Sequence, residues 1–80
     1  MSEEMGSSTR RVLVRLLEEG VEVFRPTIAV YCGEGVYRLE ATPNYDATDE
    51  TWEFLPGALV RCKERAFEGR IEYIAASLSG

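Results

Sequence analysis

The segment that decides the fold class is residues 59–76, which read LVRCKERAFEGRIEYIAA. Charged and apolar residues alternate along both of its halves, as they do on a β-strand whose side chains point to opposite faces in turn. Between the halves, Glu68-Gly69 supplies the two residues of a tight hairpin loop. The segment therefore predicts two antiparallel strands, Leu59–Phe67 and Arg70–Ala76.

A two-residue loop fixes which residues of the two strands face each other. Arg65 is expected opposite Glu72, and Phe67 opposite Arg70. Cross-strand pairs of this kind contribute about 0.2–1 kcal/mol each. Apolar residues at alternate positions predict the core side of the hairpin, which comprises Val60, Cys62, Ala66, Ile71, Tyr73 and Ala75.

Four further strands are expected before this hairpin. Residues 10–19 alternate well enough to favour a strand, although Ser8 or Thr9 could cap a helix that Gly20 would end. The remaining predicted strands are Val21–Cys32, Val36–Ala41 and Thr51–Leu55. Glycine and proline mark the turns between strands, at Gly33-Glu34-Gly35 and Pro56-Gly57.

The predicted strand at 21–32 is expected to bend at Arg25-Pro26. Val23 lies at an odd position, whereas the apolar residues Ile28 and Val30 lie at even positions. Proline cannot donate a ladder hydrogen bond and occurs at edges or bulges. We therefore predict a bulge or bend at the proline, with Ile28, Val30 and Cys32 facing inward after it.

Six short strands in a chain of this length predict an all-β fold. We expect a small five- or six-stranded antiparallel barrel, SH3-like or related, because closure removes exposed sheet edges. The barrel is expected to form a single domain over residues 10–80. Residues 1–9 are polar and are expected to be a disordered tail.

Composition narrows the classes of function. Of the 80 residues, 45 % are hydrophobic and 29 % are charged, which fits a soluble globular domain. There is no apolar run near the roughly 18 residues of a membrane span, and no basic and apolar leader, so we expect a cytoplasmic protein. The formal net charge of −5 disfavours generic binding to nucleic acid.

The sequence offers little for catalysis or metal binding. It contains no histidine, the commonest general acid or base and the commonest metal ligand. Cys32 and Cys62 match no metal or redox spacing, and both are expected to be small buried apolar residues. We therefore expect no enzyme activity, no catalytic residues, no metal site and no cofactor.

The stretch from Trp52 to Cys62 reads WEFLPGALVRC. It resembles small uncharacterised bacterial proteins that carry a Trp-Glu-Phe-x-Pro-Gly-x-x-Val-x-Cys pattern. Similarity to them extends over most of residues 12–62 and supports a strand at residues 10–19. The resemblance implies no activity.

Three groups of residues are candidate binding elements. Arg61, Lys63 and Arg65 share one strand face, either as a basic stripe for an acidic partner or as an ordinary solvated face. Trp52 and Phe54 also share a face, either in the core or as an exposed platform together with residues among Tyr31, Tyr37 and Tyr45. Arg25 could contact a ligand at the bend or bond a nearby carbonyl or carboxylate.

These features favour a non-catalytic protein-interaction module or accessory subunit. Its partner would be another protein or a second copy of this chain, bound at an exposed barrel edge or near Trp52. The alternative is a nucleic-acid-associated regulatory protein that uses the basic strand face and the aromatic residues. No membrane partner is expected.

Overall fold

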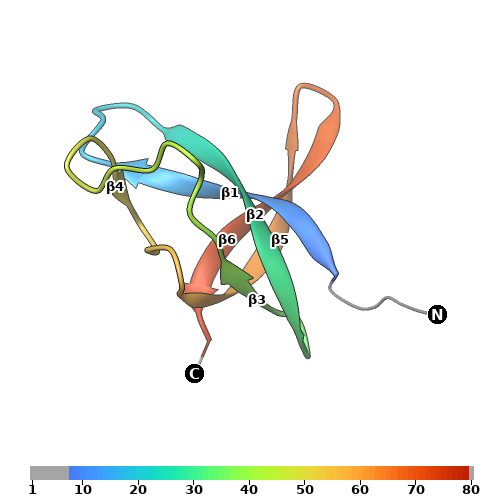
Figure 1. Cartoon of the computed structure of the whole chain (residues 1–80). Coiled ribbons are helices and arrows are strands. Elements are labelled where there is room, and N and C mark those ends of the chain that lie inside the picture. Colours follow the sequence, from blue (N-terminus) through green and yellow to red (C-terminus); the bar gives the residue numbers. More distant parts are fainter. Residues whose placement is uncertain (1–7, 80) are drawn as a thin grey trace.

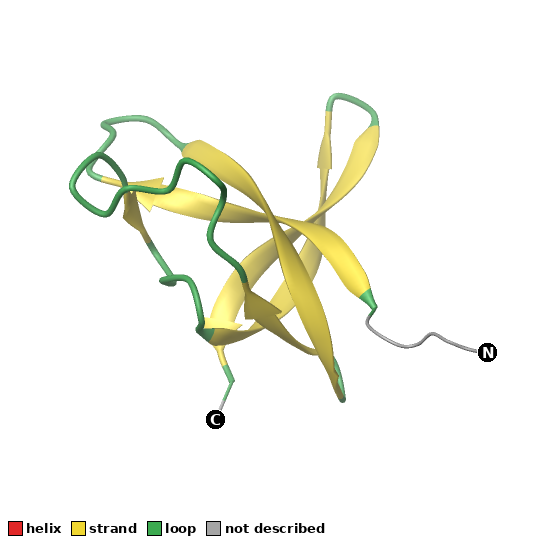
Figure 2. Ribbon diagram, viewed as in Figure 1, coloured by secondary structure: helices red, strands yellow, loops and turns green. Residues whose placement is uncertain are grey.

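A computed structural model describes residues 8–79, which form six strands and no helix (Figures 1 and 2). The strands are β1 (Thr9–Leu17), β2 (Val23–Gly33), β3 (Val36–Leu39), β4 (Thr51–Trp52), β5 (Leu59–Phe67) and β6 (Arg70–Leu78). Within these residues there is no helix with the length and apolar character that a membrane crossing requires. The first seven residues of the predicted tail lie outside the described part of the chain.

The strands form one mostly antiparallel sheet that closes into a ring. The pairs β1–β2, β2–β3, β3–β5 and β5–β6 are antiparallel. β6 then returns to β1 through parallel pairing at Leu13 and Ile74, and β4 adds to β1 through Leu16 and Trp52. The all-β prediction is confirmed. Strand pairing runs in a ring through β1, β2, β3, β5 and β6, so the fold is barrel-like without being a regular barrel.

The β5–β6 hairpin has the predicted loop, and the predicted register holds from Cys62 to Phe67. A register shift between Arg61 and Cys62 then places Arg61 opposite Ser77 and Val60 opposite Leu78. Glu68 and Gly69 have φ angles of 51° and 84°, as a type I′ turn requires at both central positions. Arg65 faces Glu72 and Phe67 faces Arg70. However, Arg65 forms its ion pair with Glu22, and Glu72 forms one with Arg11. The charged residues of the hairpin therefore form ion pairs with β1 and with the β1–β2 turn, and not across the hairpin's own two strands.

The interior of the ring is mostly apolar, and Trp52 of β4 lies in it. Trp52 is only 2 % exposed and is the largest fully buried side chain. Tyr45 packs against it edge to face, with ring centroids 5.0 Å apart. The buried core cluster comprises Val12, Val14, Leu16, Ala29, Leu39, Trp52, Val60 and Ala75.

The predicted bulge at Pro26 is absent. β1 and β2 pair in one uninterrupted register in which Leu13 faces Pro26. The buried positions that follow are Thr27 and Ala29, while Ile28 is 49 % exposed and Cys32 is exposed. The odd face thus stays inward, because the Thr27 hydroxyl can be buried by donating a hydrogen bond to the Glu40 carbonyl.

Only the base of the β5–β6 hairpin faces the core as predicted. Val60 and Ala75 are buried, and Cys62 and Tyr73 are half-buried. Nearer the tip, Ala66 is exposed and Ile71 is 60 % exposed. The cause is geometric, because the tip extends beyond the ring as a two-stranded arm (Figure 1).

Candidate functional site

The arm leaves one edge of β5 without a neighbouring strand. β3 pairs with β5 only as far as Arg61, whereas β6 pairs with β5 as far as Phe67. Within residues 8–79, no other backbone hydrogen bond reaches positions 62–67 from the open side. Exposed strand edges present unpaired N–H and C=O groups that can accept another strand.

The hairpin loop determines which backbone groups point to this edge. A two-residue loop makes Phe67 and Arg70 a hydrogen-bonded pair, so alternate residues of β5, including Arg65, bond to β6. The residues between them direct their N–H and C=O groups outward. These are Cys62, Glu64 and Ala66, and they form what we call the open edge.

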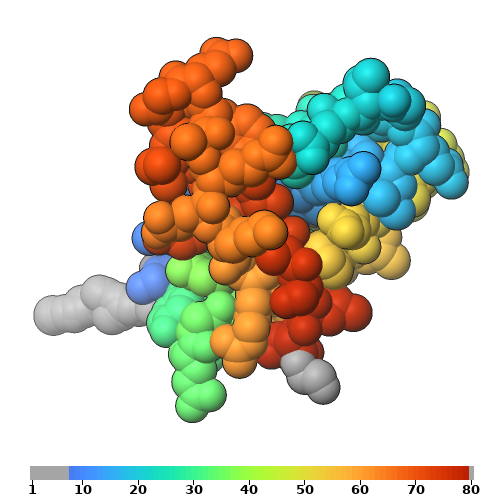
Figure 3. All heavy atoms as spheres, turned by 180° about the vertical axis from the view of Figure 1, so that it is seen from behind, coloured from blue at the N-terminus to red at the C-terminus, as the bar shows by residue number. Residues whose placement is uncertain are grey.

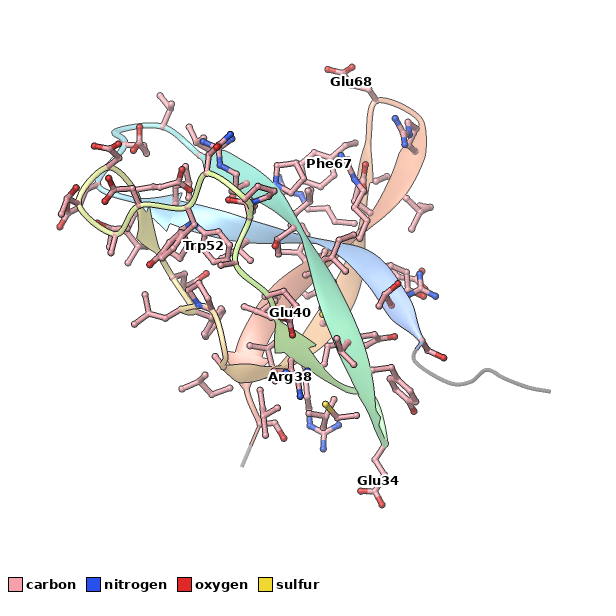
Figure 4. The ribbon with its side chains drawn as sticks, in the orientation of Figure 1. Glu34, Arg38, Glu40, Trp52, Phe67 and Glu68 are labelled. Atoms are coloured by element: carbon pink, nitrogen blue, oxygen red, sulfur yellow. The ribbon has the colours of Figure 1, made fainter. Side chains whose placement is uncertain are left out.

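A groove lies on the face of the arm that carries the odd-numbered residues of β5. Its volume is about 440 Å³. Phe24 and Arg65 line this groove. Phe24 packs edge to face against Phe67, with ring centroids 5.5 Å apart, and the Arg65 guanidinium lies over both rings. Figure 4 shows Phe67 between the arm and β2, while Glu68 at the tip points away. The lining residues include Arg15, Lys63, Ile74 and Ala76.

Charge in this groove is only partly neutralised. Arg65 bonds both carboxylate oxygens of Glu22, at 3.0 and 3.2 Å, and this hydrogen bonding lowers the pKa of Glu22. Arg15 and Lys63 form no ion pair with any residue in the described range. Glu53 lines the same groove. The groove therefore combines apolar contacts with two cationic groups available to an anionic partner.

Two residues of the predicted basic stripe form contacts within the fold, and the third does not within the described residues. Arg61, Lys63 and Arg65 are all exposed and share a strand face. Arg61 donates a hydrogen bond to the Glu34 carbonyl at 2.8 Å and so supports the β2–β3 turn. With Arg65 held by Glu22, Lys63 is the residue of the three that has no such contact within residues 8–79.

The remaining predicted site residues lie around the core. Trp52 has no accessible ring face for stacking, and the half-buried Phe54 packs against the core cluster. The Trp52 indole donates a 2.7 Å hydrogen bond to Glu50, which also accepts one from Arg25 at 3.1 Å. Figure 4 shows Trp52 directed from β4 into the ring. Arg25 thus bonds a carboxylate, and the network anchors the long loop before β4.

The sequence predicts that Glu50 belongs to a solvated acidic loop together with Tyr45, Asp46 and Asp49, and for Glu50 this is wrong. Its side chain is only 14 % exposed, and its pKa is lowered, first by the hydrogen bond from Trp52 and then by Arg25. A usable signal exists, because a buried indole N–H needs an acceptor and Glu50 stands two residues away.

A second aromatic group lies at the β2–β3 end of the ring. Tyr31 and Tyr37 pack at a tilt with centroids 5.2 Å apart, and Arg10 stacks over Tyr73 at 4.0 Å. Neither Arg10 nor Tyr73 was expected at a surface site. The Tyr73 hydroxyl donates to Glu64, which raises the pKa of Tyr73.

Comparison with known proteins finds no matching family model, no matching curated protein and no matching solved structure. Within residues 8–79, no group of three or more histidine, cysteine, aspartate or glutamate side chains could hold a metal ion.

Proposed function

We propose that this chain is a non-catalytic interaction module that binds an extended segment of a partner protein. The segment would add to the sheet as a further strand along the open edge of β5, a known mode of peptide recognition. The observation that carries the proposal is that residues 62–67 of β5 pair with β6 on one side and, among residues 8–79, with no strand on the other.

The surroundings of the edge support this function. Figure 3 shows the arm projecting beside the β1–β2 region, so that the tip stands clear of the ring. Main-chain hydrogen bonds contribute about 0.5–1.5 kcal/mol each and do not depend on sequence. Specificity would come from alternate side chains of the segment, which would reach the groove beside Lys63 and Arg15.

The nucleic-acid alternative has weaker support. The aromatic platform loses Trp52 to the core, and two of the three cations of the basic stripe are held by Glu34 and Glu22. Retention on single-stranded DNA that falls steeply with salt would favour it.

Substitution of Glu64 by proline tests the open edge. The N–H of Glu64 points outward, so Glu64→Pro removes a donor that the edge offers without removing one from the β5–β6 ladder. Peptides selected on the wild-type chain from a displayed random library are expected to lose about tenfold or more in affinity for Glu64→Pro, since 1.4 kcal/mol is a factor of ten. Fluorescence anisotropy of the selected peptides measures this loss.

Glu64→Ala is the matched control, because it removes the same carboxylate and keeps the N–H. It is expected to bind the peptides within a few-fold of the wild type. Thermal unfolding followed by circular dichroism checks the fold, and Ala66→Pro repeats the test at a second outward position. Peptides that bind both proline variants as well as the wild type, or no enrichment of peptides at all, would overturn the proposal.

A further inference from the structure

We infer that the open edge of β5 rejects a second copy of this chain and selects a partner strand with a defined order of charges. The inference rests on the proposed function and specifies the chemistry of its ligand. It follows from which backbone groups point outward and from the charges on Lys63, Glu64 and Arg65.

The registers in which β5 could pair with a second copy of itself are restricted, because only alternate residues direct their backbone groups outward. In an antiparallel pair, hydrogen-bonded positions must both direct their N–H and C=O groups toward the other strand. On β5 these positions are Cys62, Glu64 and Ala66. Consider a two-fold dimer in which β5 pairs antiparallel with β5 of a second copy. Its axis must pass through a residue position, so that this residue faces the same residue of the second copy. The axis cannot pass between two positions.

Every central register then places like charges opposite each other. The dimer axis can lie at Lys63, Glu64 or Arg65, and each would face the same residue of the second copy. In the register centred on Glu64, Lys63 would also face Arg65 of the second copy. Like charges directly opposite are destabilising, so the edge resists dimerisation.

A different strand can satisfy the same charges. The Glu64 carboxylate accepts a hydrogen bond from the neutral Tyr73 hydroxyl but has no cationic partner within residues 8–79, so a residue opposite it should be basic. A residue opposite Lys63 should be acidic, and it would also approach the cationic side of the groove that Arg15 lines. Residues opposite Cys62 and Ala66 should be apolar. Arg65 is already paired with Glu22, so it selects a partner residue less strongly than Lys63 and Glu64 do, although its charge still acts on a residue placed directly opposite.

We take the partner strand to run antiparallel to β5, as β3 does at the same edge, and this direction sets the order of its residues. Read from its N-terminus, the partner strand passes Ala66 first and Cys62 last. Its predicted pattern is apolar, any residue, basic, acidic, apolar. Such a segment differs from β5 itself, which carries Lys63, Glu64 and Arg65 in succession.

Peptide selection on charge-reversed variants tests this pattern. Peptides selected on the wild-type chain should carry the basic-acidic order, and Lys63→Glu should replace the acidic preference by a basic one. Arg70→Glu makes the same charge change at the tip, outside the groove, and should leave the pattern unchanged. Selected peptides that require the Glu64 N–H but show no such order would refute this inference and leave the proposed function standing. Failure to select any peptide would refute the proposed function.

Self-association provides an independent test. The wild-type chain is expected to be monomeric by sedimentation velocity at concentrations where the combined variant Lys63→Glu/Glu64→Thr dimerises. The combined variant removes the Glu64 repulsion and would place the new acid opposite Arg65 of the second copy, so we expect its self-association to strengthen about tenfold or more, equivalent to 1.4 kcal/mol. Lys63→Glu alone keeps the Glu64 repulsion and should remain monomeric. A wild-type dimer that Glu64→Pro abolishes, or a combined variant that stays monomeric, would overturn the inference.

Discussion

Replacing Trp52 with alanine is expected to lower the free energy of unfolding by about 3–5 kcal/mol. Trp52 is 2 % exposed, packs against Tyr45 and connects β4 to β1 through its pairing with Leu16. Domains of this size are stable by about 5–15 kcal/mol in total, so the substitution should remove much of the stability. Urea denaturation followed by circular dichroism measures the change.

Leu55 provides the comparison for this large effect. It stands three residues further along the chain and is 58 % exposed. Leu55→Ala is expected to change the free energy of unfolding by less than about 0.5 kcal/mol, as surface substitutions usually do. Equal losses in the two variants would contradict the assignment of Trp52 to the core.

Substituting Glu50 by alanine is expected to destabilise the fold by about 1–3 kcal/mol at neutral pH, because the Trp52 indole N–H would lose its acceptor. The same carboxylate also holds Arg25, so the loop before β4 would lose its attachment to β2. Urea denaturation at pH 7 measures the loss.

The contribution of Glu50 should also depend on pH. Its pKa in the folded chain lies below the ordinary value of 4.5, because the charged form accepts hydrogen bonds from Trp52 and Arg25. Stability from the charge is therefore present above pH 4.5 and is lost as the pH falls through the folded-state pKa. Glu50→Gln keeps an acceptor but not the charge. The difference in unfolding free energy between the wild type and Glu50→Gln should therefore shrink as the pH falls from 4.5 through the folded-state pKa. A difference that does not vary with pH would assign the effect to packing.

Local signals predicted the parts of the fold that depend on local geometry. Glu68 and Gly69 both have positive φ and form a two-residue loop. This loop length places Phe67 opposite Arg70 and so sets the register of the adjoining part of β5 against β6. At Pro56-Gly57 the predicted turn is present, with φ of 92° at Gly57 and a hydrogen bond from Ala58 to the Leu55 carbonyl.

The errors arose where distant segments decide the outcome. At Pro26 the apolar pattern suggested a change of face, but Thr27 is buried because the carbonyl of Glu40, the residue after β3, supplies an acceptor. Arg65 faces Glu72 as predicted, but its ion pair is with Glu22, which approaches from the β1–β2 turn. Neither contact can be predicted from the residues that neighbour Thr27 or Arg65 in the sequence.

The candidate site was predictable only in part. Alternation along β5 placed Lys63 on an exposed face, which is where it lies. The open edge could not be predicted in the same way, since it exists because β3 stops pairing at Arg61 while β6 continues to Phe67. The difference in length between two neighbours of one strand is a tertiary property.

The narrow closure of the ring has a consequence for the order of folding. The β5–β6 and β1–β2 pairings join neighbouring segments. Within residues 8–79, the backbone pairing of β1 with β6 is confined to Leu13 and Ile74, beside an ion pair between residues 61 positions apart, Arg11 and Glu72. Loop-closure entropy makes such distant contacts late events. We expect two hairpin units to form first and the closure to follow the rate-limiting step, so weakening the bridge would accelerate unfolding and leave the folding rate nearly unchanged.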